Sequence, residues 1–325
     1  LLDPAAYSHP ADDIRLVQTH ISCVLLAGDY VYKFKKPVNF GFLDFSTLEK
    51  RRFCCEQELL LNRRLCPEIY LGLVTVTREG GVYHLNGRGE VVEYGVRMAR
   101  MPEERMMGRV IAAGGLTRAH LDALVAVLVP FYEKSEHGPA IDRFGTAEAV
   151  AVNVLENFEQ TRGYVGGGAL SVAQFEAISA YARGVLALEE LFARRIAAGR
   201  IRDCHGDLYS ANICLADRVY IYDCIEFNQR FRYCDVASDI AFLAMDLDYH
   251  GLPELSAYFV ERFSAAAGDP GLRELLPFYK CYRAYVRGKI GLFTAGDAAV
   301  AESVRASCLA GAGRYFQLAH GYAAG

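Results

Sequence analysis

Hydrophobic and polar positions alternate in short runs over the first hundred residues, a pattern typical of β-strands. Residues 13–36, DIRLVQTHISCVLLAGDYVYKFKK, predict three strands, with a turn at Gly28 and Asp29 between the second and the third. A Gly-Gly turn within residues 71–85 predicts a further hairpin, and residues 91–101 are apolar enough for a central strand. This part of the chain is therefore expected to form a small antiparallel sheet.

A helical period of 3.6 residues interrupts the strand pattern once and then dominates the rest of the chain. The first helix is expected to begin after Ser46 or Thr47, either of which serves as its N-cap. Beyond Pro102 long helices are expected, over residues 117–134, 146–161, 171–198, 253–267 and 272–295, with one hairpin at 213–223. The pattern predicts an α+β, two-lobed fold, with a small sheet lobe at 1–101 and a larger, mainly helical lobe at 102–325.

The charge balance does not favour nucleic acid or a membrane as a partner. The 325 residues include 35 Lys and Arg against 39 Asp and Glu, a formal net charge of -4. The start lacks the basic and apolar regions of a secretory signal, and the apolar run at 124–133 is shorter than the roughly 20 residues that span a bilayer. We therefore expect a cytoplasmic protein. Its first residue is Leu, so the sequence leaves open whether it belongs to a longer chain.

Ten cysteines occur without any C-x-x-C pair, so neither a zinc ribbon nor a redox motif is expected. Each lies among apolar residues, and a chain of this size needs no disulfides to fold. We expect reduced thiols, as in the cytoplasm.

The segment CHGDLYSANICLADRVYIYD carries polar residues at a spacing that suggests chemistry. In protein kinases the motif H-R-D-x-x-x-x-N supplies an Asp that accepts the proton of the acceptor hydroxyl and an Asn that holds magnesium. Here His205, Asp207 and Asn212 reproduce that spacing, and Asp223 follows the next hairpin. Taken alone, His-Gly-Asp is equally typical of a turn with a core histidine. Because turn chemistry does not require Asn212 and Asp223 as well, a phosphoryl-transfer site is the favoured interpretation.

The motif H-G-D-x-x-x-x-N followed by a hydrophobic residue and Asp resembles that of the aminoglycoside phosphotransferase and choline kinase family. The segments QTHIS, YKFKKPVNFGFLDFSTLEKRR and DCIEFNQRFRYCDVASDIAFLAMDL are similar to a group of bacterial aminoglycoside phosphotransferase-like proteins, many of which carry an additional P-loop domain. The resemblance implies a protein-kinase-like fold that binds ATP and Mg2+. It also implies a small-molecule hydroxyl acceptor and, as a further partner, a P-loop ATPase domain or protein.

The resemblance assigns roles to residues in both lobes. It matches Lys33 to the lysine that contacts the α- and β-phosphates, with Lys35 on the same strand face as the alternative. Glu58 is the expected partner of that lysine, and Glu56 is the runner-up. In the same resemblance Asp207 is the catalytic base, while the metal ligands are Asn212 and Asp223.

Two features depart from the family pattern. The segment QTHIS contains no glycine, so Thr19 and Ser22 are expected to contact the phosphates of ATP through backbone NH groups and hydroxyls, with His20 as a further donor. Glu226 stands three residues after Asp223 rather than two, and its role is open.

The segments after Asp223 are expected to bind the acceptor and to support the catalytic loop. Asp235 and Asp239 are expected to anchor that loop, and an N-cap role for Asp235 is compatible with this. For the acceptor, Asp246 and Asp248 could hold a cationic sugar.

A basic, tyrosine-rich helix face contains Lys280, Arg283, Arg287 and Lys289. It is either a solvated surface or, if it lines the cleft, a binding site for an anionic acceptor. The first hypothesis is thus a kinase for a hydroxyl of a small metabolite, such as an anionic sugar or polyol. The alternatives are an aminoglycoside phosphotransferase and a nucleotide-binding regulatory module that works with a P-loop ATPase.

Overall fold

The computed structural model describes residues 1–297 and 300–325. The chain divides into two compact units, each made of two separate stretches of sequence. The first unit contains residues 1–110 and 212–229, and the second contains residues 111–211 and 230–325. The short segment 212–229 therefore packs with the N-terminal part of the chain, although it lies far from it in sequence.

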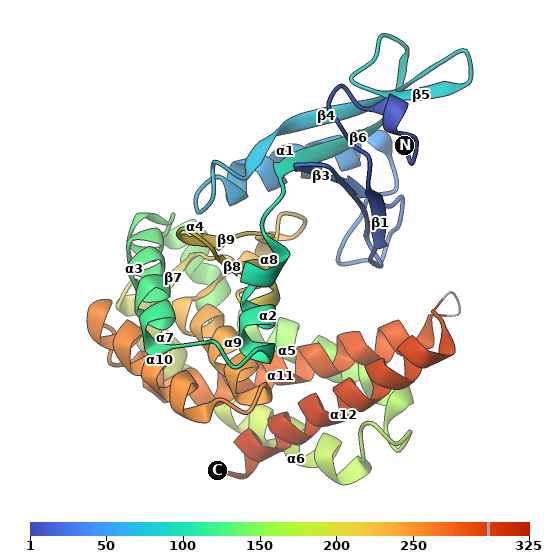
Figure 1. Ribbon diagram of the computed structural model, residues 1–325. Helices are drawn as coiled ribbons and strands as arrows, with labels where there is room; N and C mark the ends of the chain where they lie inside the picture. Colours follow the sequence, from blue (N-terminus) through green and yellow to red (C-terminus); the bar gives the residue numbers. More distant parts are fainter. Residues whose placement is uncertain (298–299) are drawn as a thin grey trace. The chain divides into compact units, whose positions relative to one another are not determined.

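The first unit is built on a six-stranded sheet in which all neighbouring strands are antiparallel, in the order β1-β2-β3-β6-β4-β5 (Figure 1). The strands are β1 (Ile14–Gln18), β2 (Ser22–Ala27), β3 (Tyr30–Lys35), β4 (Tyr70–Glu79), β5 (Val82–Leu85) and β6 (Glu90–Ala99). The three strands predicted within residues 13–36 are confirmed, as is the turn at Gly28, whose φ of 57° favours glycine.

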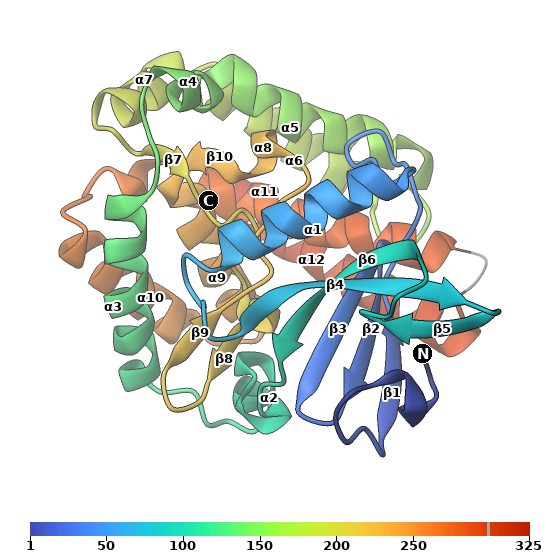
Figure 2. The same ribbon diagram turned by 90° about the horizontal axis from the view of Figure 1, so that it is seen from above.

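One helix, α1 (Leu48–Asn62), packs against the sheet of the first unit (Figure 2). The Thr47 hydroxyl accepts a hydrogen bond from the Lys50 NH at 3.3 Å, so Thr47 is its N-cap. Its apolar side packs on Val96 and Met98 of β6. The same unit includes the hairpin of β8 (Ile213–Leu215) and β9 (Val219–Ile221).

The second unit is mainly helical. Its helices are α3 (Arg118–Lys134), α4 (Pro139–Asp142), α5 (Ala147–Thr161), α6 (Val172–Leu186), α7 (Glu189–Ala197), α9 (Val236–Tyr249), α10 (Pro253–Ala266), α11 (Leu272–Gly296) and α12 (Glu302–Ala324). The strands β7 (Ile201–Asp203) and β10 (Tyr233–Asp235) pair antiparallel. Helices α2 (Met107–Ala112) and α8 (Gln229–Arg232) lie where the chain passes between units. Among residues 1–297 and 300–325, no helix combines the length and apolarity of a bilayer span.

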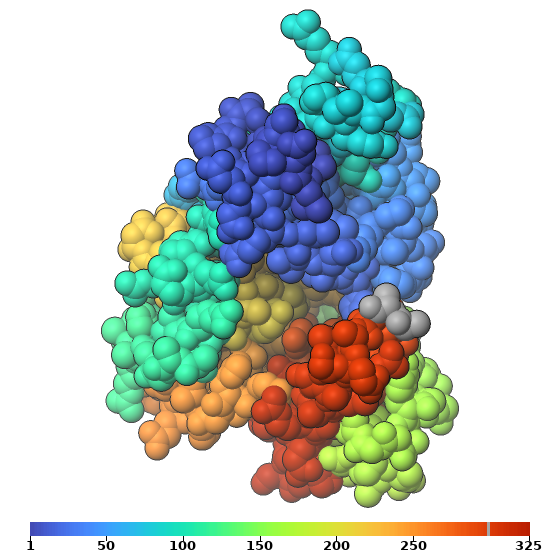
Figure 3. Space-filling view, turned by 45° about the vertical axis from the view of Figure 1, so that its right-hand side comes forward, coloured from blue at the N-terminus to red at the C-terminus, as the bar shows by residue number. Residues whose placement is uncertain are grey.

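Helix α9 forms the centre of the second unit, since every residue from Val236 to Leu247 is buried. Helices α11 and α12 run side by side (Figure 1). In the space-filling view of Figure 3, α12 lies on the surface of this unit beside α6. The contact of α11 with α12 is close because Gly288 of α11 faces the ring of Phe316 of α12.

Two parts of the helical pattern differ from the sequence prediction. Residues 171–198 form two helices, α6 and α7, which separate at Ala187 and Leu188 without a Gly or Pro to mark the break. Helix α12 was not among the predicted helices, because Gly311, Gly313 and Gly321 lower the helical propensity of its sequence.

Candidate active site

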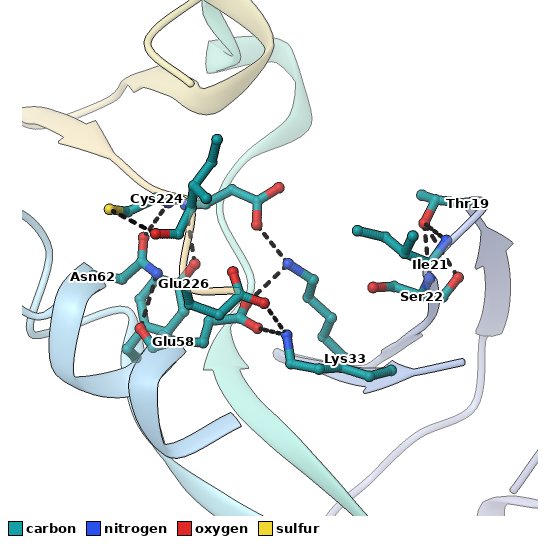
Figure 4. A network of polar contacts seen from close by, with 12 residues as sticks. Thr19, Ile21, Ser22, Lys33, Glu58, Asn62, Cys224 and Glu226 are labelled. Carbon is teal, nitrogen blue, oxygen red and sulfur yellow. Dashed lines mark hydrogen bonds and ion pairs between the residues drawn. The ribbon is translucent and has the colours of Figure 1, made fainter. Parts of the chain in front are cut away.

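Strand β3 directs two lysines into a buried group of carboxylates in the first unit (Figure 4). Lys33 and Lys35 are two residues apart, so they share one face of the strand. The Lys33 Nζ donates to Glu58 Oε1 at 2.9 Å and to Asp223 Oδ1 at 2.5 Å. The Lys35 Nζ donates to Glu58 Oε2 at 2.8 Å and also pairs with Glu226. A single strand face therefore brings together two cations and three anions.

Glu58 is fully buried and gives one carboxylate oxygen to each lysine. Burial raises the pKa of Glu58, but the charges of Lys33 and Lys35 outweigh it and hold the pKa at about 2. Glu56, the runner-up from the sequence, pairs instead with Arg52 on the helix surface at 2.9 Å. Helix α1 thus presents Glu58, not Glu56, to Lys33.

The backbone of the segment that begins at Asp223 donates hydrogen bonds to two side chains, those of Tyr70 and Asn62. The Asp223 NH donates to the Tyr70 hydroxyl at 3.1 Å, and the Cys224 NH donates to Asn62 Oδ1 at 2.8 Å. The Asn62 amide in turn donates to the Glu58 carbonyl at 2.8 Å. Asp223 has a φ of 63°, a left-handed conformation that few non-glycine residues adopt. These contacts hold the Asp223 backbone while its side chain keeps 40% exposure.

Glu226, whose role the sequence analysis left open, is the third carboxylate of the group around Lys33 and Lys35. Its carboxylate is 5% exposed and its partner, the Lys35 ammonium, is 1% exposed. Burial raises the pKa of Glu226, and the Lys35 charge opposes that shift. The same burial lowers the pKa of Lys35, but Glu226 and Glu58 raise it above its ordinary value. The pair ties the end of the Asp223 segment to β3.

The turn between β1 and β2 contains the two residues predicted to contact phosphates. The Thr19 NH donates to the Ser22 carbonyl at 2.9 Å, and the Ser22 NH donates to Thr19 Oγ1 at 3.0 Å. Ser22 is buried. The hydroxyl of Thr19 therefore closes a tight turn in which no glycine is needed, and both NH groups are engaged within it.

In the second unit, Asp239 of α9 holds the loop that carries Asp207. The fully buried Asp239 carboxylate accepts from the His205 NH at 2.7 Å and from the Gly206 NH at 2.9 Å. The Tyr132 hydroxyl donates to the same carboxylate at 3.1 Å. Gly206 has a φ of 86°, which explains the glycine in this motif. Asp239 thus fixes the backbone immediately before Asp207.

Further contacts fix the loop on both sides of Asp207. The Asp207 NH donates to His205 Nδ1 at 3.2 Å, so this histidine is a structural part of the loop. The Arg283 guanidinium donates to the Gly206 carbonyl at 2.9 Å. The Ser210 NH donates to Asp246 Oδ2 at 3.0 Å. The loop is therefore anchored by α9 and α11 over its whole length.

Asp235 has a different structural role from Asp239. Its side chain accepts from the Ala237 NH at 2.9 Å as the N-cap of α9. It also pairs with the buried Arg195 at 2.7 Å, and Arg195 in turn pairs with Asp269. The cap predicted from the sequence is present, and it positions the helix that carries Asp239.

Most of the residues expected to bind the acceptor have partners inside the second unit. Asp246 is buried and binds Ser210, while Arg283 is buried and binds the Gly206 and Ser238 carbonyls. Asp248 accepts from Lys280 at 2.7 Å and from the Tyr322 hydroxyl. The Arg287 guanidinium makes cation–π contacts with the rings of Tyr209 and Tyr315. The basic face of α11 is thus packed against neighbouring elements rather than solvated.

The predicted site residues are divided between the two units. Lys33, Glu58, Asn212 and Asp223 belong to the first unit, and Asp207 belongs to the second. Asn212 is buried immediately before β8, and its carbonyl accepts from the Tyr222 NH at 3.0 Å. Only four residues separate Asp207 from Asn212 along the chain.

Comparison with known proteins gives one group of sequence relatives. No family model matches the chain. Uncharacterized proteins of Mycobacterium tuberculosis and Mycobacterium bovis are 35% identical over 296 residues, which is 89% of this chain and 57% of theirs. The chain therefore spans little more than half the length of these relatives.

Solved structures with similar folds are more distant in sequence. An ethanolamine kinase of Plasmodium vivax matches with a TM-score of 0.50 and 10% identity, covering 96% of this chain and 81% of that one. An amicoumacin kinase, solved with AMP-PNP and Ca2+, matches with a TM-score of 0.50 and 12% identity, covering 98% and 91%. An ADP-bound aminoglycoside phosphotransferase has a TM-score of 0.47 and 13% identity over 96% and 94%.

Proposed function

We propose that this chain, which has the protein-kinase-like fold of the ethanolamine and amicoumacin kinases, is an ATP- and Mg2+-dependent phosphotransferase. Its acceptor is a hydroxyl group of a small metabolite. The observation that carries the proposal is the contact of Lys33 with both Glu58 and Asp223. In protein kinases a strand lysine paired with a helix glutamate contacts the phosphates of the nucleotide, and a nearby aspartate holds the metal.

The oxygen groups of Asn212 and Asp223 suit a magnesium ion. Mg2+ prefers oxygen ligands and is usually held by one or two protein groups together with substrate phosphates. Within the described ranges, His, Cys, Asp and Glu side chains form no cluster of three that would enclose a metal by themselves. The exposed Asp223 carboxylate and the Asn212 amide fit a metal that is shared with ATP. Bound there, Mg2+ would neutralise charge on the phosphates.

Asp207 is the proposed base for the acceptor. The acceptor oxygen forms a bond to the γ-phosphorus while the bond from that phosphorus to the ADP oxygen breaks, and the hydroxyl proton passes to the Asp207 carboxylate. The rigid loop held by Asp239 and Arg283 keeps this carboxylate in one place. Lys33 would contact the α- and β-phosphates of a bound nucleotide, and Asp223, its present partner, would hold the metal. Thr19 and Ser22 lie in the turn proposed to cover the nucleotide.

The acceptor we favour is an anionic sugar or polyol. An aminoglycoside, the alternative, is a polycation and would need open carboxylates, whereas Asp246 and Asp248 are engaged by Ser210 and Lys280. A regulatory module with a P-loop ATPase partner is the second alternative. It is favoured by the greater length of the relatives, of which this chain covers 57%. In either case we expect a cytoplasmic location.

A calorimetric titration with MgATP tests the nucleotide site. Asp223→Ala should lower the affinity on the order of 100-fold, because a metal ligand that neutralises the phosphates is lost. Asp207→Ala should keep affinity near the wild-type value, because this residue faces the acceptor. Asp217→Ala, an exposed position in the β8–β9 hairpin, is the control. Equal losses in Asp223→Ala and Asp207→Ala would contradict the assigned roles.

A further inference from the structure

Helix α11 carries four basic side chains toward its neighbours, and three of them have hydrogen-bond acceptors within the chain. Lys280 donates to Asp248 at 2.7 Å, Arg283 donates to the Gly206 carbonyl at 2.9 Å, and Lys289 donates to Gln160 Oε1 at 2.8 Å. Arg287 differs from these three. Its Nε is buried and has no hydrogen-bond partner among residues 1–297 and 300–325.

Two aromatic rings lie within cation–π distance of the Arg287 guanidinium. Its centre lies 4.7 Å from the ring centroid of Tyr209 and 5.7 Å from that of Tyr315. Such rings stabilise a guanidinium by cation–π attraction, but they carry no net charge to neutralise it. Within the described part of the chain no carboxylate lies at ion-pair distance from Arg287. Burial of a cation carries a desolvation cost, which an anion bound beside it would offset.

Arg287 also faces the catalytic loop. It follows Arg283 by four residues, so the two side chains share one face of α11. Arg283 contacts Gly206, the residue before Asp207, and Arg287 contacts Tyr209, two residues after Asp207. Burial lowers the pKa of Arg287, but Tyr209, Tyr315 and, to a smaller extent, the negative charge of Asp207 raise it above its ordinary value. Arg287 thus lies on the side of the loop that carries the base.

We propose that Arg287 binds an anionic group of the acceptor, a phosphate or a carboxylate of a sugar or polyol whose hydroxyl is directed to Asp207. This inference rests on the proposed kinase function and specifies its substrate class. The planar guanidinium fork matches two oxygens of either anion. The other candidate acceptor contacts already form hydrogen bonds or ion pairs within the chain: Asp246 with Ser210, Asp248 with Lys280 and Arg283 with Gly206. Among these candidate acceptor contacts, Arg287 has a buried donor, its Nε, without a hydrogen-bond partner in the described part of the chain.

The test uses pairs of acceptors of which one member carries an anionic group and the other does not. ATP consumption is measured with ribose 5-phosphate against ribose, gluconate against sorbitol, and kanamycin as a polycation, using the whole chain and Arg287→Met and Arg287→Lys. We expect the acids to be the better acceptors. Loss of a charged hydrogen-bonding pair should raise KM for the acids about 10- to 100-fold in Arg287→Met, with a smaller change in kcat. Arg287→Lys should recover part of the loss.

Three controls make the result specific. MgATP affinity should be unchanged in both variants, since a loss there would mean that the nucleotide phosphates are the anion and would overturn the proposal. Thermal unfolding shows whether Arg287→Met remains folded. Arg314→Met removes a positive charge from the neighbouring aromatic group, where Arg314 donates to the Tyr249 hydroxyl at 2.6 Å, and it should behave as wild type.

The remaining outcomes also decide the matter. Equal use of acids and their neutral parents, or preference for kanamycin, overturns the anion site. If no acceptor is consumed, calorimetry of ribose 5-phosphate and gluconate decides instead. Binding that Arg287→Met abolishes supports the site, and no binding to the wild type overturns it. The calorimetric titrations of ribose 5-phosphate and gluconate contain no nucleotide, so they test the anion site independently of the kinase function. If the protein does not bind MgATP at all, the kinase function is refuted, whatever those titrations show.

Discussion

The two lysines of β3 share Glu58 but have different surroundings, and this gives them different roles. Lys33 reaches Asp223, whose side chain is 40% exposed, whereas Lys35 reaches Glu226, whose side chain is 5% exposed. Because solvent reaches the Lys33–Asp223 contact, a bound ligand can also reach it and replace one of the partners. The Lys35–Glu226 pair is buried and closed to ligands, so its role is to hold the segment that follows Asp223. Lys33 is therefore the lysine that we expect to contact the nucleotide.

We expect Lys33→Met and Lys35→Met to fail in different measurements. Lys33→Met should lower kcat about 10²- to 10³-fold, because a charge that stabilises the transferred group is lost. Lys35→Met should instead lower the free energy of unfolding by about 3–5 kcal/mol, because Glu226 is left as an unpaired buried charge. Denaturant unfolding and ATP turnover of both variants provide the comparison.

The double variant Lys35→Met/Glu226→Gln serves as the matched control, since removing both charges should restore part of the stability. Should Lys35→Met be stable and inactive while Lys33→Met is active, the roles of the two lysines are reversed.

The sequence predicted the polar groups of the site better than the contacts that support them. Asp207, Asn212 and Asp223 were found because a motif spacing marks them. Tyr70, Asn62 and Glu226 had no comparable signal, since their partners lie up to 191 residues away and only the fold brings them together. The only local hint of the second ion pair was that Lys33 and Lys35 are both lysines on the same face of one strand.

At the scale of elements, the packing of α11 against α12 depends on a glycine of α11. Helix propensity describes an isolated helix and disfavours glycine. In α11 the neighbouring helix α12 leaves no room for a side chain at Gly288. A Cβ built on Gly288 would lie 2.8 Å from ring atoms of the fully buried Phe316. The close approach of the two helices therefore depends on the absence of a side chain at this position.

Gly288→Ala tests that dependence. Alanine has a higher helix propensity than glycine by about 1 kcal/mol, but the clash with Phe316 should outweigh it and destabilise the protein by about 1–3 kcal/mol. Gly184→Ala in α6 is the matched control, because no atom lies within 4 Å of the added Cβ. That variant should be as stable as the wild type or more stable. Equal effects of the two substitutions in thermal unfolding would show that packing at Gly288 is loose.

At the scale of the whole molecule, the α+β, two-lobed protein-kinase-like fold predicted from the sequence is confirmed. The stability of the molecule should also depend on pH through a buried lysine. Burial lowers the pKa of Lys289 to about 8, with the Arg230 charge adding to this and the Glu156 charge opposing it. Its ammonium therefore costs stability at neutral pH.

We expect Lys289→Met to raise the free energy of unfolding at pH 7 by about 1–2 kcal/mol, after allowing for the lost hydrogen bond to Gln160. The folded pKa lies below the ordinary value of 10.5, so the cost is complete below about pH 8 and disappears as the pH rises to 10.5. The advantage of the variant should therefore shrink over that range. Lys134→Met, at an exposed position in α3, should show no such trend in pH-dependent unfolding.

The passage of residues 212–229 into the first unit bears on how the protein forms during translation. When the ribosome has made residues 1–110, the sheet and α1 are complete in sequence, but Lys33 and Lys35 still lack Asp223 and Glu226. More than a hundred further residues must be synthesised before those carboxylates emerge. Until they do, Glu58 is the one of these three carboxylates that the two lysines can reach, and a fragment that ends at residue 110 lacks the other two.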